Sequence, residues 1–171
     1  MADIVIDHVI DNSDEFKRAM KDGVEAALEA IGQQAVAHAK HIITTESRVD
    51  SGELRNTTSH RVVKKESAVY VGNPLEYAIY NEYGTGIYGE EKASNGWWVY
   101  VAGSKSGNGK HSGKRYTREE AAKIVARMRA EGLDAHMTQG MKGIHFIRDA
   151  VKDHITEYES IAKNEIMKKL P

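Results

Sequence analysis

The chain has 171 residues, which predicts a single domain with room for one inserted lobe. Its 24 Lys and Arg residues against 25 Asp and Glu residues give a formal net charge of −1. That balance excludes a globally basic nucleic-acid binder, although a local basic patch remains compatible with it. The chain has no cysteine, so disulfides and thiolate metal sites are excluded. No apolar run approaches the roughly 20 residues of a membrane helix. No secretory signal is visible near the first residue, and we therefore expect folding inside the cell.

The first third of the chain predicts one short strand and one long helix. Residues 3–10 alternate weakly between apolar and polar side chains, which is typical of a strand. From about residue 14 to residue 45, apolar residues recur every three or four positions, which predicts a single amphipathic helix. Gly23 and Gly32 weaken this helix by about 1 kcal/mol each relative to alanine. We expect them to allow close packing of another backbone.

A loop, a hairpin and a short helix are predicted next. Residues 49–55 contain a Ser-Gly turn and are expected to form a loop. Two β-type runs at 60–64 and 68–72 are separated by a short polar link, which favours a hairpin. Residues 75–83 predict a short helix, which is expected to end at Gly84 because glycine adopts positive φ at helix ends.

The following segment predicts a small lobe built as strand, helix and strand. Residues 97–102, Trp-Trp-Val-Tyr-Val-Ala, read as a strand. Thr117 and Glu120 form a capping box, which predicts a helix that continues to Gly132. Residues 133–138 then read as a second strand, so the lobe is expected to be βαβ-like.

The C-terminal segment predicts one amphipathic helix after a Gly-Met-Lys-Gly turn at 140–143. The expected fold class is therefore α+β. A small antiparallel sheet packs with the long N-terminal and C-terminal helices, and the lobe at about 87–139 is inserted between them. The apolar residues expected to be buried together in this core are Leu28, Ile31, Val71, Ile147 and Val151.

Four short motifs follow one another in a specific order. Residues 49–55 read Val-Asp-Ser-Gly-Glu-Leu-Arg, and residues 68–72 read Ala-Val-Tyr-Val-Gly. Residues 77–85 read Tyr-Ala-Ile-Tyr-Asn-Glu-Tyr-Gly-Thr, and residues 146–150 read Phe-Ile-Arg-Asp-Ala. In order and spacing, these motifs resemble the tail-completion, or head–tail joining, protein family of long-tailed bacteriophages and prophages.

The resemblance covers two separate parts of the chain, roughly residues 14–86 and 140–170. It implies a core joining-protein domain made of residues 1–86 and 140–171. The stretch 87–139 is longer than the usual connector of the family, and it is therefore expected to be an insertion.

The resemblance implies a structural virion morphogenesis protein with no catalytic residue, no cofactor and no metal. Such a protein assembles into a ring, hexameric by resemblance, in the neck or tail of the virion after folding in the host cytoplasm. Its expected partners are other copies of the chain, a head-completion protein and the tail tube or tail terminator. The resemblance leaves open tail completion, head completion and tail termination. It places the candidate interface residues in two of the motifs: Arg55, Tyr77, Tyr80, Glu82 and Tyr83.

Two expectations for Glu82 are compatible with its position beside a helix end. Its carboxylate can bond nearby backbone or a basic group. As an interface residue, it is expected to tolerate replacement by arginine without loss of the fold, while assembly is impaired.

A basic, glycine-rich stretch at 103–118 offers an alternative function, a nucleic-acid-binding module. We expect this loop to be mobile, because its four glycines make ordering costly. Its partner could be the phosphates of DNA in a channel or an acidic surface of a neighbouring copy. We favour the protein partner because the chain as a whole is not basic. The residues that would make this contact are Lys105, Lys110, Lys114, Arg115 and Arg118.

An enzyme, such as a nuclease, is the third class considered. His38 and His41 lie three residues apart on the long helix and could share a face, but no zinc-binding signature accompanies them. The glycine-rich loop lacks the spacing of a phosphate-binding P-loop. Structural roles for the eight histidines are therefore favoured over a metal or catalytic site.

Overall fold

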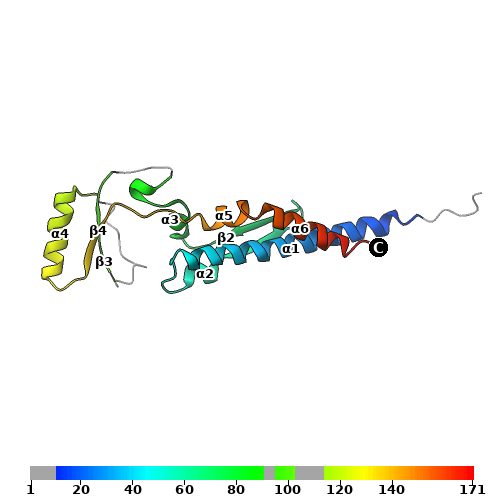
Figure 1. The fold of residues 1–171 in the computed structure, drawn as a ribbon, viewed down its shortest axis with the longest axis horizontal. Coiled ribbons are helices and arrows are strands. Elements are labelled where there is room, and N and C mark those ends of the chain that lie inside the picture. Colours follow the sequence, from blue (N-terminus) through cyan, green and yellow to red (C-terminus); the bar gives the residue numbers. More distant parts are fainter. Residues whose placement is uncertain (1–10, 91–94, 103–113) are drawn as a thin grey trace, which may run out of the picture.

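The computed structural model describes residues 11–90, 95–102 and 114–171. Its longest helix, α1 (Ser13–Thr45), runs along the part of the molecule against which α5 (Phe146–Lys152) and α6 (Ile155–Met167) pack (Figure 1). The helix predicted over 14–45 is therefore confirmed. Helices α5 and α6 lie along α1 and run antiparallel to it (Figure 1). The strand expected at 3–10 falls outside the described residues. Within the described residues, no helix has the length and apolar character needed to cross a membrane.

Small residues form the buried face of α1, and they bring its neighbours unusually close. A Cβ atom at Gly23 would lie only 2.9 Å from the Cα of Ile166 on α6. A Cβ atom at Gly32 would collide with the ring of His60 and the side chain of Val69. The close backbone approach expected at both glycines is thus confirmed at Gly23, whereas the close neighbours of Gly32 are side chains. The buried residues of α1 are Gly23, Ala27, Gly32, Ala35, Ala39 and Ile43.

The predicted hairpin packs against α1. Strands β1 (Ser59–Val63) and β2 (Ala68–Gly72) pair antiparallel, with Ser59 opposite Gly72 and Val63 opposite Ala68. The preceding segment was expected to be a loop, but it contains a one-turn helix, α2 (Glu53–Thr57). Its formation depends on Leu54, which is only 4% exposed and anchors the turn in the core.

A separate lobe lies at the far end of the molecule from α6 (Figure 1). It contains β3 (Trp98–Val101), α4 (Arg118–Ala130) and β4 (Ala135–Thr138), so the predicted order of strand, helix and strand is confirmed. The two strands pair antiparallel, whereas the strands of a typical βαβ unit are parallel. The predicted capping box is present, because Thr117 and Glu120 each accept a hydrogen bond from the backbone of the other.

The central core differs from the one predicted. Of the five residues expected to be buried together, Val151 is 43% exposed, and Leu28, Ile31, Val71 and Ile147 are only half-buried. The expectation of a core made by these residues is therefore wrong. The reason is that the small-residue face of α1 packs inward, so its larger apolar side chains lie at the edges of the contact. The core instead consists of Ala39, Ile43, Leu54, Ala78, Ile144, Phe146 and Ala150.

The C-terminal helix was predicted as one element, but it breaks into α5 and α6 at Asp153 and His154. Tyr158 donates a hydrogen bond of 2.7 Å from its hydroxyl group to the backbone carbonyl of Ala150. In an unbroken helix, that carbonyl would accept from residue 154. The tyrosine thus satisfies a carbonyl that the break would leave unpaired, and His154 stacks against His38 of α1.

Candidate functional site

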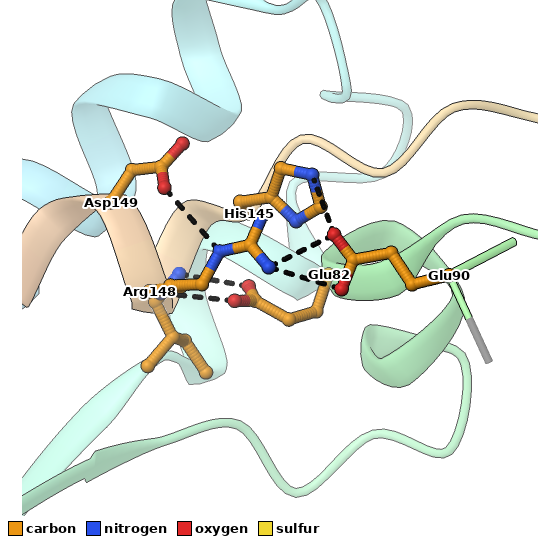
Figure 2. A network of polar contacts seen from close by, with 6 residues as sticks. Glu82, Glu90, His145, Arg148 and Asp149 are labelled. Carbon is orange, nitrogen blue, oxygen red and sulfur yellow. Dashed lines mark hydrogen bonds and ion pairs between the residues drawn. The ribbon is translucent and has the colours of Figure 1, made fainter. Parts of the chain in front are cut away.

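The short helix α3 (Ala78–Tyr83) and the start of α5 meet through the carboxylate of Glu82 (Figure 2). Its Oε2 accepts a hydrogen bond of 2.9 Å from the backbone N–H of Ile147, and its Oε1 accepts one of 2.9 Å from the backbone N–H of Arg148. These N–H groups belong to the first turn of α5, where helices lack internal acceptors and favour negative charge. Glu82 therefore caps α5 and joins the motif at 77–85 to the motif at 146–150.

This position revises the expectation for Glu82. The residue is only 5% exposed, and both of its carboxylate oxygens are used inside the chain. The expectation that its carboxylate can bond nearby backbone is confirmed. An arginine at this position would bury a positive charge against backbone donors, so the fold cannot be expected to tolerate it.

A second, more exposed network surrounds the same helix end (Figure 2). The Nη1 atom of Arg148 lies 2.9 and 3.0 Å from the two carboxylate oxygens of Glu90. The Nε2 atom of His145 lies 3.4 Å from one of those oxygens, and the Nε atom of Arg148 lies 3.6 Å from the carboxylate of Asp149. The network ties the segment after α3 to α5. Sequence reasoning missed it, because Glu90 lies outside the motifs.

Glycines allow two chain segments to cross beside this network. The N–H of Thr85 donates to the carbonyl of Met141, and the N–H of Ile87 donates to the carbonyl of Gln139. Gly86 opens the short 3₁₀ turn Gly86–Tyr88 at φ 63°, and a Cβ atom there would overlap the carbonyl oxygen of Gln139. A Cβ atom at Gly140 would likewise collide with the backbone of Thr85. These crossings carry the chain into the lobe and back.

The outward face of α3 and its flanks carries large apolar side chains. Tyr77, Ile79, Tyr80 and Tyr83 are 40 to 56% exposed, and Tyr88 just beyond them is 46% exposed. The inward face of the same helix carries one small apolar residue, Ala78, and two polar residues, Asn81 and Glu82, and all three are buried. A helix in a free-standing protein shows the opposite arrangement. We call the residues Tyr77, Ile79, Tyr80 and Tyr83 the aromatic face.

A surface cleft of about 590 Å³ lies beside the aromatic face, between the segment 47–54 and α3. Asn81 of α3 and Tyr77, which directly precedes α3, line it on one side, and Arg48 and Glu53 line it on the other. Partial burial and the neighbouring Glu53 carboxylate raise the pKa of Tyr77. The motif at 49–55 and the motif at 77–85 therefore share one surface.

Arg55, the remaining residue expected at an interface, lies on α2 near this surface and is half-buried. Among the described residues, its guanidinium group makes no hydrogen bond or ion pair. Of the five expected interface residues, the structure thus brings Arg55 and the three tyrosines to the surface and places Glu82 inside.

The basic residues expected to contact DNA or a partner are described only in part. Lys105 and Lys110 lie outside the described residues, as does most of the loop that was expected to be mobile. Lys114, Arg115 and Arg118 are exposed at the entry to α4. The ammonium group of Lys114 lies 5.4 Å from the ring centre of Tyr116, a cation–π distance.

The histidines are arranged differently from the pair considered in the sequence. His41 is exposed on α1 and does not join His38 in a site. His38 instead meets His154 and Glu157 from the C-terminal helix. The spacing of His154 and Glu157, three residues apart, was the available signal, but only the packing of α6 on α1 brings them to His38.

Comparison with known proteins supports the resemblance over the first half of the chain. Residues 7–84 match the model of a family described as "Bacteriophage HK97-gp10, putative tail-component". The matched segment includes the motifs at 49–55 and 68–72 and nearly all of the motif at 77–85. The resemblance to phage tail-completion proteins is therefore confirmed over this segment, and it supports a structural role as a phage tail component. No curated protein and no solved structure matches the chain.

Proposed function

We propose that the protein is a structural virion component that assembles into a ring at the phage head–tail joint, with the aromatic face as a contact between subunits. The observation behind this proposal is that α3 exposes large apolar side chains and buries polar ones. Ile79, Tyr80 and Tyr83 of α3 and the preceding Tyr77 are exposed, whereas Asn81 and Glu82 are buried. Exposed apolar clusters of this kind mark protein–protein contacts, and tyrosine is enriched in such contacts.

The architecture behind the aromatic face supports a rigid docking surface. Glu82 fixes α3 to α5 from the inside, and the glycine crossing fixes the segment that follows. A contact whose residues are already held in place loses less entropy on binding. A ring requires a heterologous contact, in which this surface meets a different surface of the next copy.

The other partners follow from the resemblance alone. We propose a head-completion protein and the tail tube or tail terminator as neighbours of the ring, and the neck or tail of the virion as its place. We also propose that residues 1–86 with 140–171 form the joining domain and that 87–139 is an insertion. The family match covers residues 7–84 of that domain, which carry the motifs at 49–55 and 68–72 and nearly all of the motif at 77–85.

Contact of the lobe with DNA is a second, weaker candidate. Lys114, Arg115 and Arg118 are all exposed where the chain enters α4, which suits phosphate contact. A gel-shift assay over a salt series tests it. Binding that falls steeply with salt, and falls again when Lys105, Lys110 and Lys114 are replaced by serine, would support it. Loss of oligomer in that variant without any DNA effect would assign the lobe to a protein partner.

The experiment that tests the ring is a mass measurement in solution with negative-stain imaging, for the original chain and two variants. Tyr80→Ser removes an exposed tyrosine of the aromatic face. Tyr70→Ser is the matched control, because Tyr70 on β2 is similarly exposed, at 51% against 53%. Tyrosine anchors at interfaces contribute about 2 kcal/mol or more. We therefore expect discrete rings for the original chain and for Tyr70→Ser, and smaller species for Tyr80→Ser.

The result that contradicts the proposal is equally direct. If the original chain remains a monomer both alone and when mixed with the tail proteins of the same phage, it forms no ring. If Tyr80→Ser assembles as well as the original chain, the ring contact lies elsewhere.

A further inference from the structure

Two histidines and a glutamate meet where α6 lies against α1. His38 comes from the middle of α1, His154 precedes the first turn of α6, and Glu157 lies within that turn. One ligand atom from each residue lies within 4.8 Å of the other two. The closest pair is the Nε2 atom of His38 and the Oε2 atom of Glu157, at 2.9 Å. Imidazole and carboxylate groups in such a cluster are the ligands that zinc and similar divalent metals take.

The cluster leaves one polar atom unsatisfied. The rings of His38 and His154 are stacked, with centroids 3.5 Å apart and an angle of 30° between their planes. The Nδ1 atom of His154 is buried and has no hydrogen-bond partner among the described residues. Buried nitrogen atoms in native proteins nearly always have a partner. Stacking alone therefore leaves His154 incompletely satisfied.

A supporting residue already orients the carboxylate. The amide nitrogen of Gln34 donates a hydrogen bond of 2.9 Å to the Oε1 atom of Glu157, so that Oε2 faces His38. Outer residues that fix a ligand in this way strengthen metal sites. Gln34 and His38 lie one turn apart on α1, which places both side chains on the same face of the helix.

The geometry requires only side-chain movement. Zinc bonds of about 2.0–2.2 Å place two tetrahedral ligand atoms roughly 3.3 Å apart. The His38–Glu157 pair at 2.9 Å must open slightly, and the His154 ring must turn out of the stack to aim a nitrogen at the ion. The Glu157 side chain is 41% exposed, which leaves an entry path and room for water as a fourth ligand.

We propose that His38, His154 and Glu157 bind a divalent transition-metal ion of the zinc class, and that this ion fastens α6 to α1. The site is structural, and it is independent of the ring proposed above. An ion that binds only the folded chain stabilises it by mass action. Because metal ligands bind in their deprotonated form, zinc binding should weaken as the pH is lowered.

The test is a calorimetric titration of the chain with zinc chloride at neutral pH, together with thermal unfolding with zinc and with EDTA. We expect saturable binding of one zinc ion per chain and a higher Tm with zinc. Glu157→Gln keeps an oxygen that can accept from Gln34 but removes the charged ligand, so we expect at least about tenfold weaker binding. His154→Ala should lose binding.

His41→Ala is the matched control, because His41 lies on the same helix, is exposed and stands outside the cluster. It should bind zinc as the original chain does. The proposal is overturned if the original chain shows no saturable binding, or if Glu157→Gln binds zinc as tightly as His41→Ala does. If His154→Ala fails to fold, as judged by circular dichroism, Glu157→Gln decides the question.

Discussion

Glu82 and Arg148 lie 66 residues apart in the sequence, yet a hydrogen bond of 2.9 Å joins the backbone N–H of Arg148 to the Glu82 carboxylate. A second bond of equal length comes from Ile147. Glu82 thus satisfies two N–H groups at the start of α5 and holds α3 in its orientation. The polar side of α3 is used internally, which leaves its aromatic face toward the outside.

Removing the Glu82 carboxylate should destabilise the fold. Hydrogen bonds to charged groups contribute about 1.5–3 kcal/mol each, and Glu82 accepts two, so Glu82→Ala should lower the free energy of unfolding by about 3–6 kcal/mol. Glu82→Arg should lower it at least as much, and Glu82→Gln should lower it less. Urea unfolding measures the change. The control is Glu76→Ala, an exposed neighbour that should change stability by no more than about 0.5 kcal/mol. Equal effects of Glu82→Ala and Glu76→Ala would refute the capping role.

Replacing Gly86 should disturb the crossing that leads to the lobe. Gly86 and Gly132 both have positive φ, at 63° and 84°, so alanine strains the backbone at each. Only at Gly86 would the new Cβ atom also meet a carbonyl oxygen, whereas nothing lies within 4 Å of that position at Gly132. We therefore expect Gly132→Ala to cost about 1 kcal/mol and Gly86→Ala clearly more. Similar melting temperatures for the two variants would show that the crossing is loosely packed.

The core can be tested with two residues of helix α5. Phe146 is fully buried and Val151 is 43% exposed. Phe146→Ala should therefore lower the free energy of unfolding by about 3–5 kcal/mol. Val151→Ala should lower it by less than about 1 kcal/mol, because folding removes only part of the apolar surface of Val151 from contact with water. A larger loss for Val151→Ala than for Phe146→Ala would restore the core first expected from the sequence.

The raised pKa of Tyr158 leads us to expect that the folded chain loses stability at high pH. Burial, with a smaller contribution from the Glu157 charge, raises the pKa of Tyr158 from 10.0 to about 12. An unfolded chain would ionise this tyrosine near pH 10, whereas the folded chain keeps it neutral to about pH 12. The stability that the neutral hydroxyl provides is therefore complete below pH 10 and is lost as the pH rises through about 12. Spectrophotometric titration of the original chain against Tyr158→Phe should assign the last tyrosine transition to this residue.

The elements with regular local patterns were predictable from the sequence. The long helix, the hairpin and the capping box of α4 each depend on spacing or on chemistry within a few residues, and each is confirmed. The break between α5 and α6 was not predictable in this way. It is accompanied by a hydrogen bond from the Tyr158 hydroxyl group to the carbonyl of Ala150, eight residues earlier.

The site was predictable in its motifs but not in the roles of its residues. Periodicity identifies apolar stripes, and it therefore favoured Leu28 over the small residues that α1 actually buries. Nothing local distinguishes Glu82, which points inward, from Tyr80, which points outward, because both lie in one short helix. The contact of His38 with His154 depends on how α6 packs along α1, which joins residues far apart in the sequence.

The most direct measurement of the central claim is hydroxyl-radical footprinting of the isolated chain and of the chain within purified phage particles. If the aromatic face is a subunit contact, Ile79, Tyr80 and Tyr83 should react readily in the isolated chain, where they are 42 to 56% exposed. The same residues should be strongly protected in the particle. Labelling of all three in the particle at the level of the isolated chain would contradict the claim, because it would leave the aromatic face uncovered in the assembled virion.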